Sequence, residues 1–313
     1  MIYAVCLNPC LDKSASLPRF QLDAPNRIAM ERVDVGGKGV NVARVIKELG
    51  GDGLLVGFDY QGGPVGRAME KEKVPCRMQR VPGALRVNMK LRETETGRTL
   101  EINEQGAEIS GQDMARMEET LLSLIKPGDY VSLSGSLPYR APLDAYARLC
   151  RGVKEKGAFA AVDCDGEALA AALAEKPDLI KPNAQEFRAL TGADPFDRKE
   201  AAEACREMLG RGVGMVCLSL GSQGAMLISK AGAWACPAAP VPVLGAQGAG
   251  DSMLAALLVA LSQGRSPGEA LRFASAAAGA SVSRPGTLLC QRTDTLALME
   301  KCCVTIQLTL NSD

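Results

Sequence analysis

The sequence predicts an α/β protein with a mainly parallel central sheet, helices on both faces of that sheet, and a small separate β-sheet. The chain has 313 residues, enough for one large domain with a substantial core. Short apolar runs alternate with amphipathic segments along most of the chain, which is typical of strand–helix–strand units. One region instead follows the two-residue period of a β-hairpin. These three observations define the fold class.

The expected strands of the central sheet are short apolar runs at residues 2–7, 54–58, 130–133, 159–163, 179–180 and 215–220. Helices are expected at residues 39–49, 113–125, 143–156, 251–263 and 267–282. Two of the helical patterns are followed directly by Gly50 and Gly157, as expected for C-terminal caps. Because the strands alternate with helices, the sheet should be largely parallel and covered on both faces.

Two segments depart from this alternation. Residues 86–92 alternate strictly between polar and apolar side chains, residues 95–98 form an expected turn, and a strand pattern resumes at residues 99–103. This pattern predicts a β-hairpin. The helix-poor stretch over residues 10–35 is expected to join it. We therefore expect a single domain over residues 1–313 with a β-sheet lid built from about residues 10–35 and 84–108.

The composition excludes several classes of function. Lys plus Arg and Asp plus Glu both number 36, so no net charge favours binding to nucleic acid or to an anionic membrane. Aromatic residues are only 4% of the chain, which argues against base-stacking surfaces. The absence of histidine excludes Ser-His-Asp hydrolases, Cys-His proteases and histidine-bound metals. Acid–base chemistry must come from a carboxylate, lysine, tyrosine or cysteine.

The cysteines and the apolar runs indicate a soluble cytoplasmic protein. The eleven cysteines are scattered and include no Cys-x-x-Cys motif, as expected for free thiols in a reducing compartment. Residues 1–9 have no basic lead-in, so we do not expect a signal peptide. The longest apolar run, residues 253–261, is much shorter than a membrane span.

The sharpest motif is a glycine-framed aspartate at the start of the helix expected at residues 251–263. Gly248, Ala249 and Gly250 precede Asp251. Glycines before a helix let an anion approach the free N–H groups at the helix start. An aspartate beside that anion could accept the proton of a hydroxyl group during phosphoryl transfer. The competing interpretation is that Asp251 only caps the helix.

A second glycine-rich motif precedes the helix expected at residues 39–49. Gly36 and Gly37 allow a hydroxylated ligand to touch the backbone, with Lys38 and Asn41 as polar contacts. The motif is not a Walker A loop, because the required glycine spacing and Ser/Thr are missing. A tight turn followed by an exposed lysine would produce the same sequence.

A third motif, Lys181-Pro-Asn183-Ala-Gln-Glu186, follows a short expected strand. Asn183 and Glu186 have the spacing of a capping box, so a purely structural role is one interpretation. In the other, the Glu186 carboxylate lies at the carboxyl end of the sheet and helps to hold Mg²⁺ through water.

Further polar residues fall at the same expected edge. A period of two places Arg86, Asn88 and Lys90 on one face of the hairpin, where two cations beside an amide could hold a phosphate. The alternative is a solvated sheet face. Asp12 and Ser136 each follow an expected strand, at the edge where open α/β sheets bind ligands. The convergence of these motifs on one edge is more informative than any motif alone.

Taken in order, the motifs resemble those of the ribokinase-like (PfkB-type) carbohydrate kinases, most closely the branch with 1-phosphofructokinase and tagatose-6-phosphate kinase. They are Asn8-Pro9-x-x-Asp12, Gly36-Gly37-Lys38-Gly39-Val40-Asn41, Arg86-Val87-Asn88-x-Lys90, Ser134-Gly135-Ser136-Leu137-Pro138, Lys181-Pro182-Asn183-x-x-Glu186, Ser219-Leu220-Gly221-x-x-Gly224 and Gly248-Ala249-Gly250-Asp251. The resemblance implies a ribokinase-like three-layer α/β/α body with a β-sheet lid, ATP with Mg²⁺, a sugar-phosphate substrate and a homodimer formed through the lids.

The resemblance also implies roles for single residues. Asp251 is expected to be the base, with the N–H groups of Gly248, Ala249 and Gly250 around the transferring phosphoryl group. Glu186 is expected at Mg²⁺, and the residues expected beside the nucleotide are Lys181, Asn183, Ser219, Gly221 and Gly224. The acceptor is expected to contact Asp12, Gly37, Lys38, Asn41, Asn88 and Ser136. Arg86 and Lys90 are expected at a phosphate already on the sugar.

These expectations lead to an ATP-dependent kinase acting on a ketohexose phosphate. Fructose 1-phosphate at its 6-hydroxyl is the first choice, and tagatose 6-phosphate at its 1-hydroxyl is the second. A rival from another class is a non-catalytic sugar-phosphate sensor on the same scaffold, because Gly245 and Gln247 replace the Ser/Thr and the apolar residue usual in the family. A dinucleotide-binding oxidoreductase is a weaker rival, since no Gly-x-Gly-x-x-Gly motif follows the first expected strand.

Overall fold

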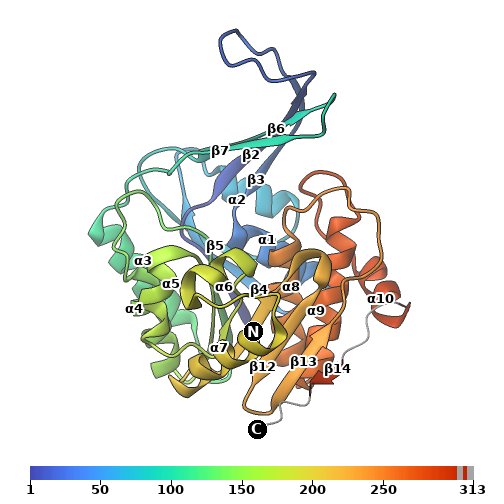
Figure 1. Cartoon of the computed structure of the whole chain (residues 1–313). Helices are drawn as coiled ribbons and strands as arrows, with labels where there is room; N and C mark the ends of the chain where they lie inside the picture. The colour runs from blue at the N-terminus through green and yellow to red at the C-terminus, as the bar shows by residue number, and fades with distance from the viewer. Residues whose placement is uncertain (302–305, 309–313) are drawn as a thin grey trace.

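The computed structural model describes residues 1–301 and 306–308, and its centre is a ten-stranded sheet (Figure 1). The strand order is β14-β13-β12-β11-β10-β9-β8-β1-β4-β5. Neighbouring strands from β11 to β5 are parallel, and the β11–β14 edge is antiparallel. The strands are β1 (Ile2–Cys6), β4 (Gly53–Asp59), β5 (Cys76–Arg80), β8 (Tyr130–Ser134), β9 (Phe159–Asp163), β10 (Leu179–Ile180), β11 (Met215–Ser219), β12 (Ala225–Ser229), β13 (Gly232–Cys236) and β14 (Ile306–Leu308).

Helices cover both faces of this sheet. One face packs against α3 (Gly111–Leu124), α4 (Ala145–Glu155), α5 (Gly166–Leu173), α6 (Ala184–Thr191) and α7 (Arg198–Gly210). The other packs against α1 (Lys38–Glu48), α2 (Pro64–Lys71), α8 (Ala249–Ser262), α9 (Pro267–Val282) and α10 (Arg292–Lys301). A short 3₁₀ turn, η1 (Gly221–Gln223), follows β11. The fold class expected from the alternation is confirmed.

Successive side chains of β1 point to opposite faces of the sheet, so this one strand contributes to both hydrophobic cores. Tyr3 and Val5 belong to the core on the α3–α7 side, while Ile2 and Ala4 belong to the core on the α1–α8 side. All four side chains are buried. A strand buried on both faces has no polar side, so β1 is a continuous apolar run rather than an alternating one.

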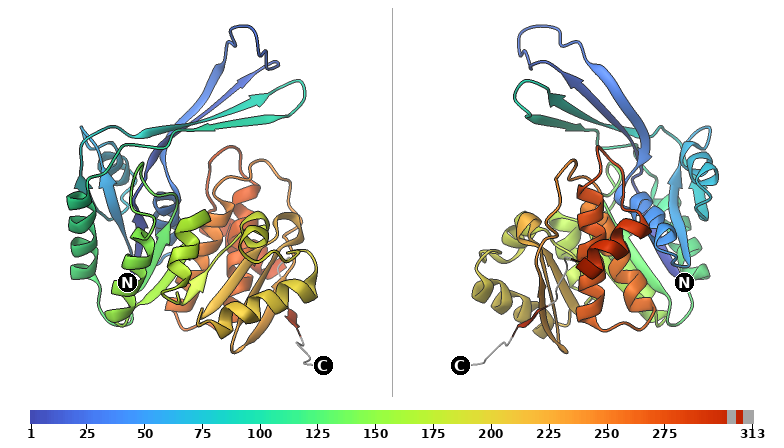
Figure 2. Two further views of the ribbon diagram at one scale, coloured as in Figure 1. Left: turned by 60° about the vertical axis from the view of Figure 1, so that its left-hand side comes forward. Right: turned by 90° about the vertical axis from the view of Figure 1, so that its right-hand side faces the viewer.

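A second, four-stranded sheet stands apart from the body, as Figure 2 shows from two sides. Its order is β3-β2-β6-β7, and its strands are β2 (Cys10–Leu17), β3 (Ala29–Gly36), β6 (Arg86–Glu93) and β7 (Thr99–Asn103). The expected hairpin is confirmed, because β6 and β7 pair antiparallel. The pairing of β2 with β6 is parallel, so this sheet, the lid, is mixed.

Two further expectations concern free thiols and membrane-spanning helices. The nine cysteines among the described residues are free, and Cys302 and Cys303 lie outside those residues. Within the described part of the chain, no helix combines the length and apolar character that crossing a membrane requires.

Candidate active site

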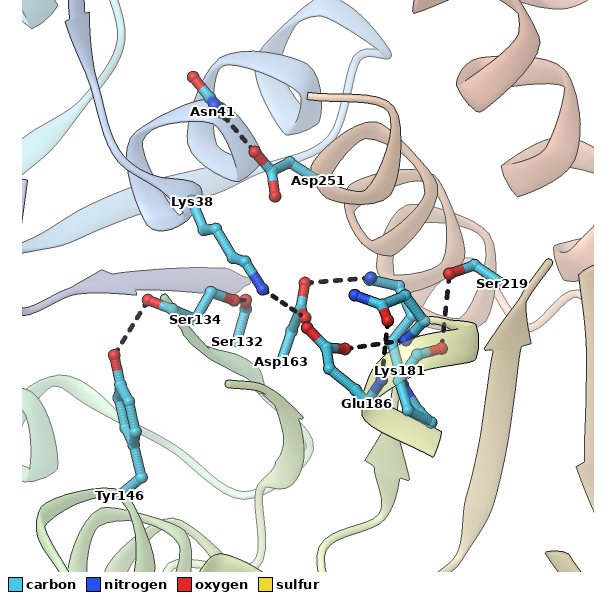
Figure 3. Close-up of polar contacts among 12 residues, drawn as sticks. Lys38, Asn41, Ser132, Ser134, Tyr146, Asp163, Lys181, Glu186, Ser219 and Asp251 are labelled. Atoms are coloured by element: carbon cyan, nitrogen blue, oxygen red, sulfur yellow. Dashed lines mark hydrogen bonds and ion pairs between the residues drawn. The ribbon is translucent and has the colours of Figure 1, made fainter. Parts of the chain in front are cut away.

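Polar side chains of the body that the sequence singled out gather at the carboxyl edge of the parallel strands, among them Lys38, Asn41, Lys181, Glu186, Ser219 and Asp251 (Figure 3). Neighbouring strands β9, β10 and β11 end at Asp163, Ile180 and Ser219. Parallel strands all present their carboxyl ends at one edge, so residues distant in sequence become neighbours there. Lys38, Glu186 and Asp251 lie in the first turns of α1, α6 and α8, so three helices begin at this edge, where a helix has free N–H groups.

Asp251 lies in the first turn of α8, and Gly248 is the cap of that helix. Gly248 has a φ of 74°, a left-handed conformation that suits glycine. The Asp251 carboxylate accepts a hydrogen bond from Asn41 Nδ2, which lies 2.8 Å from Oδ2. The Asp251 side chain therefore bonds to α1 and does not cap its own helix, which answers the competing interpretation from the sequence.

Burial changes the protonation of Asp251. Its side chain is buried, and desolvation together with the nearby negative charge of Asp163 raises its pKa to about 6. The hydrogen bond from Asn41 and the positive charges of Lys38 and Lys181 oppose this shift. A carboxylate with a pKa of about 6 is still ionised at neutral pH and binds a proton more readily than an exposed aspartate does.

Asp163 holds two lysines at the centre of the edge. Lys38 Nζ donates to Asp163 Oδ1 at 3.0 Å, and Lys181 Nζ lies 3.2 Å from Oδ2. Burial alone would raise the pKa of Asp163, but the two ammonium groups hold it below its ordinary value. The sequence analysis did not select Asp163 as a site residue. Its place as the last residue of a parallel strand was the signal that could have found it.

The start of α8 also lies against Lys181. A methyl group added at Gly250 would lie 3.2 Å from Lys181 Nζ, so glycine at this position gives the ammonium room beside the helix start. The free N–H groups of Ala249 and Gly250 and the Lys181 charge therefore face the same space. This arrangement suits a phosphate group.

Asn183 and Glu186 form the capping box that their spacing predicts. Asn183 Oδ1 accepts from the Glu186 N–H at 2.9 Å, and Glu186 Oε2 accepts from the Asn183 N–H at 2.8 Å. The described residues contain no group of three or more acidic or cysteine ligands that could enclose a metal. Any cation bound beside Glu186 would need water or ligand phosphates to complete its coordination, as Mg²⁺ commonly does.

The residues expected beside a nucleotide lie next to this box. Ser219 pairs with Asn183 across an isolated bridge and donates through Oγ to the Pro182 carbonyl at 3.4 Å. Gly221 has open space where a side chain would begin. At Gly224 that position lies 2.1 Å from the Cys236 carbonyl oxygen, so packing alone requires glycine there.

At the lid, the polar side chains of β2 and β6 form a connected chain. Arg86 Nη1 donates to Asn88 Oδ1 at 2.8 Å, and Asn88 Nδ2 donates to Asp12 Oδ1 at 2.9 Å. The backbone register explains this order, because Asp12 lies opposite Asn88 in the parallel pair. Asp12 and Asn41 both line a cleft of about 300 Å³, so the lid network and the Asp251 partner border the same space. Gly36 leaves room for Asp12, whose Oδ2 would lie 1.9 Å from an added methyl group.

The remaining predicted residues lie around this network. Lys90 pairs with Glu101 at 3.5 Å. Gly37 caps α1 with a φ of 114°, and an added methyl group would lie 3.2 Å from Pro9 Cα. Ser136 Oγ accepts from Asn8 Nδ2 at 3.2 Å.

Asn8 is a second residue that the sequence analysis did not place in the site. Its Nδ2 also donates to the carbonyl oxygens of Gln105 and Leu137, each at 3.0 Å. Its own carbonyl oxygen accepts from Arg86 Nε at 3.2 Å. Asn8 thereby ties the end of β1 to the lid arginine and to the segment after β8. The signal for this role was its place directly after the first strand.

Comparisons with known proteins identify the family of this chain. Residues 6–294 match the model of the pfkB family of carbohydrate kinases. A 1-phosphofructokinase from Rhodobacter capsulatus is 35% identical over 88% of both chains, and that of Escherichia coli K12 is 31% identical over 96% of both. The crystal structure of Escherichia coli phosphofructokinase-2 with fructose-6-phosphate superposes with a TM-score of 0.88 at 29% identity, covering 96% of this chain and 98% of that one. The same enzyme has a tetrameric inhibited form. The chain belongs to the pfkB family of carbohydrate kinases.

Proposed function

We propose that this kinase transfers the terminal phosphoryl group of ATP to the 6-hydroxyl of fructose 1-phosphate. The observation that carries the proposal is the buried Asp251 carboxylate, held by Asn41 beside the free N–H groups of α8. Relatives named 1-phosphofructokinase at 31–35% identity support the choice of acceptor.

In this mechanism Asp251 accepts the proton of the sugar hydroxyl as its oxygen bonds to phosphorus. The bond from phosphorus to the bridging oxygen of ATP breaks, and its electron pair stays on ADP. Ala249 and Gly250 offer backbone N–H groups to the phosphoryl oxygens, where charge must be stabilised. Such a loose transfer depends on positioning and charge more than on a strong base, so the lack of histidine is no obstacle.

Mg²⁺ accompanies ATP in this proposal, as is typical of the family. It supplies positive charge at the phosphates when bound. Glu186 would hold it through a carboxylate oxygen, with Asn183 beside it. The capping box supports this role, because it fixes the direction of the Glu186 side chain.

Arg86 and Lys90 support a phosphorylated acceptor. Both lie on the lid face that carries Asp12 and Asn88, and each is half-buried. Arginine and lysine side chains are suited to phosphate binding. A second candidate acceptor is fructose 6-phosphate, because a crystal structure of the related Escherichia coli phosphofructokinase-2 contains it. Tagatose 6-phosphate is a third candidate.

The experiment is an ADP-release assay of the purified protein with MgATP and a panel of sugars. Fructose 1-phosphate should give the highest kcat/KM, followed by the other ketohexose phosphates. Equal rates with unphosphorylated fructose would contradict the role given to Arg86 and Lys90. Binding of sugar phosphate by calorimetry without ADP release from any acceptor would select the sensor instead.

We also propose that two copies associate through the lid. The face of the lid opposite Asp12 and Asn88 exposes three apolar side chains, here called the lid patch: Val33 on β3, and Leu100 and Ile102 on β7. Exposed apolar side chains on one face of a sheet favour association. Light scattering after size exclusion should report a dimer for the wild type and a monomer for Val33→Asp. Leu143→Asp, at an exposed position of the body, should remain dimeric. A wild-type monomer would refute this arrangement.

The free cysteines of the described residues are compatible with a reducing compartment. We therefore place the proposed activity in the cytoplasm.

A further inference from the structure

Lys38 does not approach the lid residues that would hold sugar hydroxyls. It is the first residue of α1, and its side chain extends along the sheet edge to Asp163, as Figure 3 shows. Asp12, in contrast, meets Asn88 and Cys10 at the base of the lid. Lys38 therefore belongs to the part of the site that contains Lys181 and Asp251, where the phosphoryl group is transferred in the proposed function.

Asp163 has two cationic partners, and Asp251 and Glu186 add negative charge near Lys38. Asp163 is buried and carries a single negative charge, yet two ammonium groups contact its two oxygens. One lysine is enough to neutralise a buried carboxylate. The second lysine is therefore not required at Asp163, and its ammonium group can move to an incoming anion.

The exposure of the two lysines shows which charge is available. The Lys181 side chain is 5% exposed and lies against Gly250. The Lys38 side chain is 36% exposed, and its Cβ lies 3.5 Å from the position of an added methyl group at Gly135. The aliphatic part of the Lys38 side chain thus packs near Gly135, and its ammonium group remains accessible. Lys181 is buried and stays the permanent partner of Asp163.

We propose that Lys38 is a catalytic residue that leaves Asp163 to contact the terminal phosphoryl group of ATP, both in bound ATP and during transfer. This inference rests on the proposed function. Asp163 serves as the resting partner of the ammonium group, and Lys181 keeps Asp163 neutralised when Lys38 moves. Lys38 begins α1 and Lys181 follows β10, so the two ammonium groups reach Asp163 from different elements.

The step balances without a proton from Lys38. The sugar O–H proton goes to Asp251, the P–O bond to the sugar forms, and the P–O bond to ADP breaks. Lys38 remains an ammonium ion throughout. Burial would lower the pKa of Lys38, but the charges of Asp163, Asp251 and Glu186 hold it above its ordinary value. Its contribution is positive charge placed where the phosphoryl oxygens pass.

The test compares Lys38→Met, Lys38→Arg and the control Lys47→Met. Lys47 lies on the same helix, is exposed, and donates to the Glu72 carbonyl. Lys38→Met should lower kcat by about 100-fold, the usual cost of removing one group that stabilises transition-state charge. The KM for the sugar phosphate and its calorimetric Kd without nucleotide should change less than about threefold, since no ground-state sugar contact is lost. Lys38→Arg should recover part of kcat, and Lys47→Met should match the wild type.

Two results would overturn the inference. A large rise in sugar Kd with kcat retained would return Lys38 to the hydroxyl-binding role expected from the sequence. A kcat within about threefold of the wild type in Lys38→Met would leave Lys38 as a structural partner of Asp163 only.

A binding measurement separates this inference from the proposed function. Calorimetry with Mg²⁺ and either ATP or ADP should show that Lys38→Met loses affinity for ATP and keeps its affinity for ADP, because only ATP carries the terminal phosphate. This readout does not require turnover, so it decides the Lys38 inference even if the wild type phosphorylates none of the sugars tested. Equal losses for both nucleotides, or no loss for either, would refute it.

Discussion

The two ends of the active site differ in how completely their polar groups are already arranged. At the body end, Asp251 and Asp163 are buried and each has a hydrogen-bond partner on α1. At the lid end, Arg86 and Lys90 are half-exposed and bond to groups of the lid and its neighbouring loops. At the body end the two carboxylates keep their positions in the proposed mechanism and only Lys38 changes its partner, whereas both lid cations must exchange their present partners for a sugar phosphate. The difference predicts that substitutions at the body end reduce kcat and that those at the lid raise KM.

The largest effect is expected from Asp251→Asn. The amide keeps the size of the side chain and can still accept from Asn41, but it cannot take a proton. We expect kcat to fall about a thousandfold, within the range seen for general bases. Steady-state kinetics gives kcat, and calorimetry should give a Kd for fructose 1-phosphate close to that of the wild type. A kcat near that of the wild type would show that the body end works without a base.

The next effect is expected from Arg86→Ala at the lid end. Loss of one charged hydrogen bond to the sugar phosphate should raise KM about 30-fold and change kcat much less. Arg92→Ala is the matched control, because Arg92 lies further along the same strand and pairs with Glu31. A fall in kcat with constant KM in Arg86→Ala would remove the distinction between the two ends.

A smaller effect is expected from Gly250→Ala. The added methyl group would lie 3.2 Å from Lys181 Nζ, so the ammonium must shift away from the start of α8. We expect kcat to fall about tenfold, because one cation moves relative to the phosphoryl group. Gly210→Ala, at the end of α7 with open space around it, should leave kcat unchanged. Equal kinetics of the two variants would mean that the Lys181 position is not important for transfer.

The smallest effect concerns stability rather than rate. Asp251 has a pKa raised to about 6 in the folded protein from an ordinary value of 3.8. The folded state therefore binds the proton more tightly than the unfolded state does. Ionisation of Asp251 therefore lowers the free energy of unfolding as pH rises from about 4 to about 6, by up to about 3 kcal/mol. Asp251→Asn should remove this cost, so its Tm should exceed that of the wild type at pH 8 and approach it at pH 4. A lower Tm of the variant at pH 8 would contradict a raised pKa of Asp251 in the folded protein.

Local patterns in the sequence predict the elements and motifs, but not the contacts between them. The helix expected at residues 267–282 is α9 itself, and the strand expected at residues 159–163 is β9. The eight-residue α2 was not expected, because so short a helix shows little periodicity. Nor were β12 and β13, which form the antiparallel edge beyond β11.

The candidate site likewise combines motifs that are local in the sequence with contacts between distant residues. The glycine frame and the start of a helix are local features, so the sequence was sufficient to select Asp251. Lys38 and Asp163 are 125 positions apart, and only the strand order of the sheet brings them together. No local pattern could reveal that Lys38 turns from the lid towards Asp163, since the direction of a long side chain depends on partners distant in sequence.

The central claim is that the body end holds a buried carboxylate prepared to accept a proton. A carbon-13 NMR titration of the aspartate side chains tests it most directly, with Asp251→Asn identifying the signal of Asp251. The charged neighbours that act on this carboxylate are Asp163, Lys38 and Lys181. The structure predicts a midpoint near pH 6 for Asp251, about two units above an exposed aspartate. A midpoint near pH 4 would mean that the carboxylate is neither buried nor influenced by Asp163, and would contradict this account of the site.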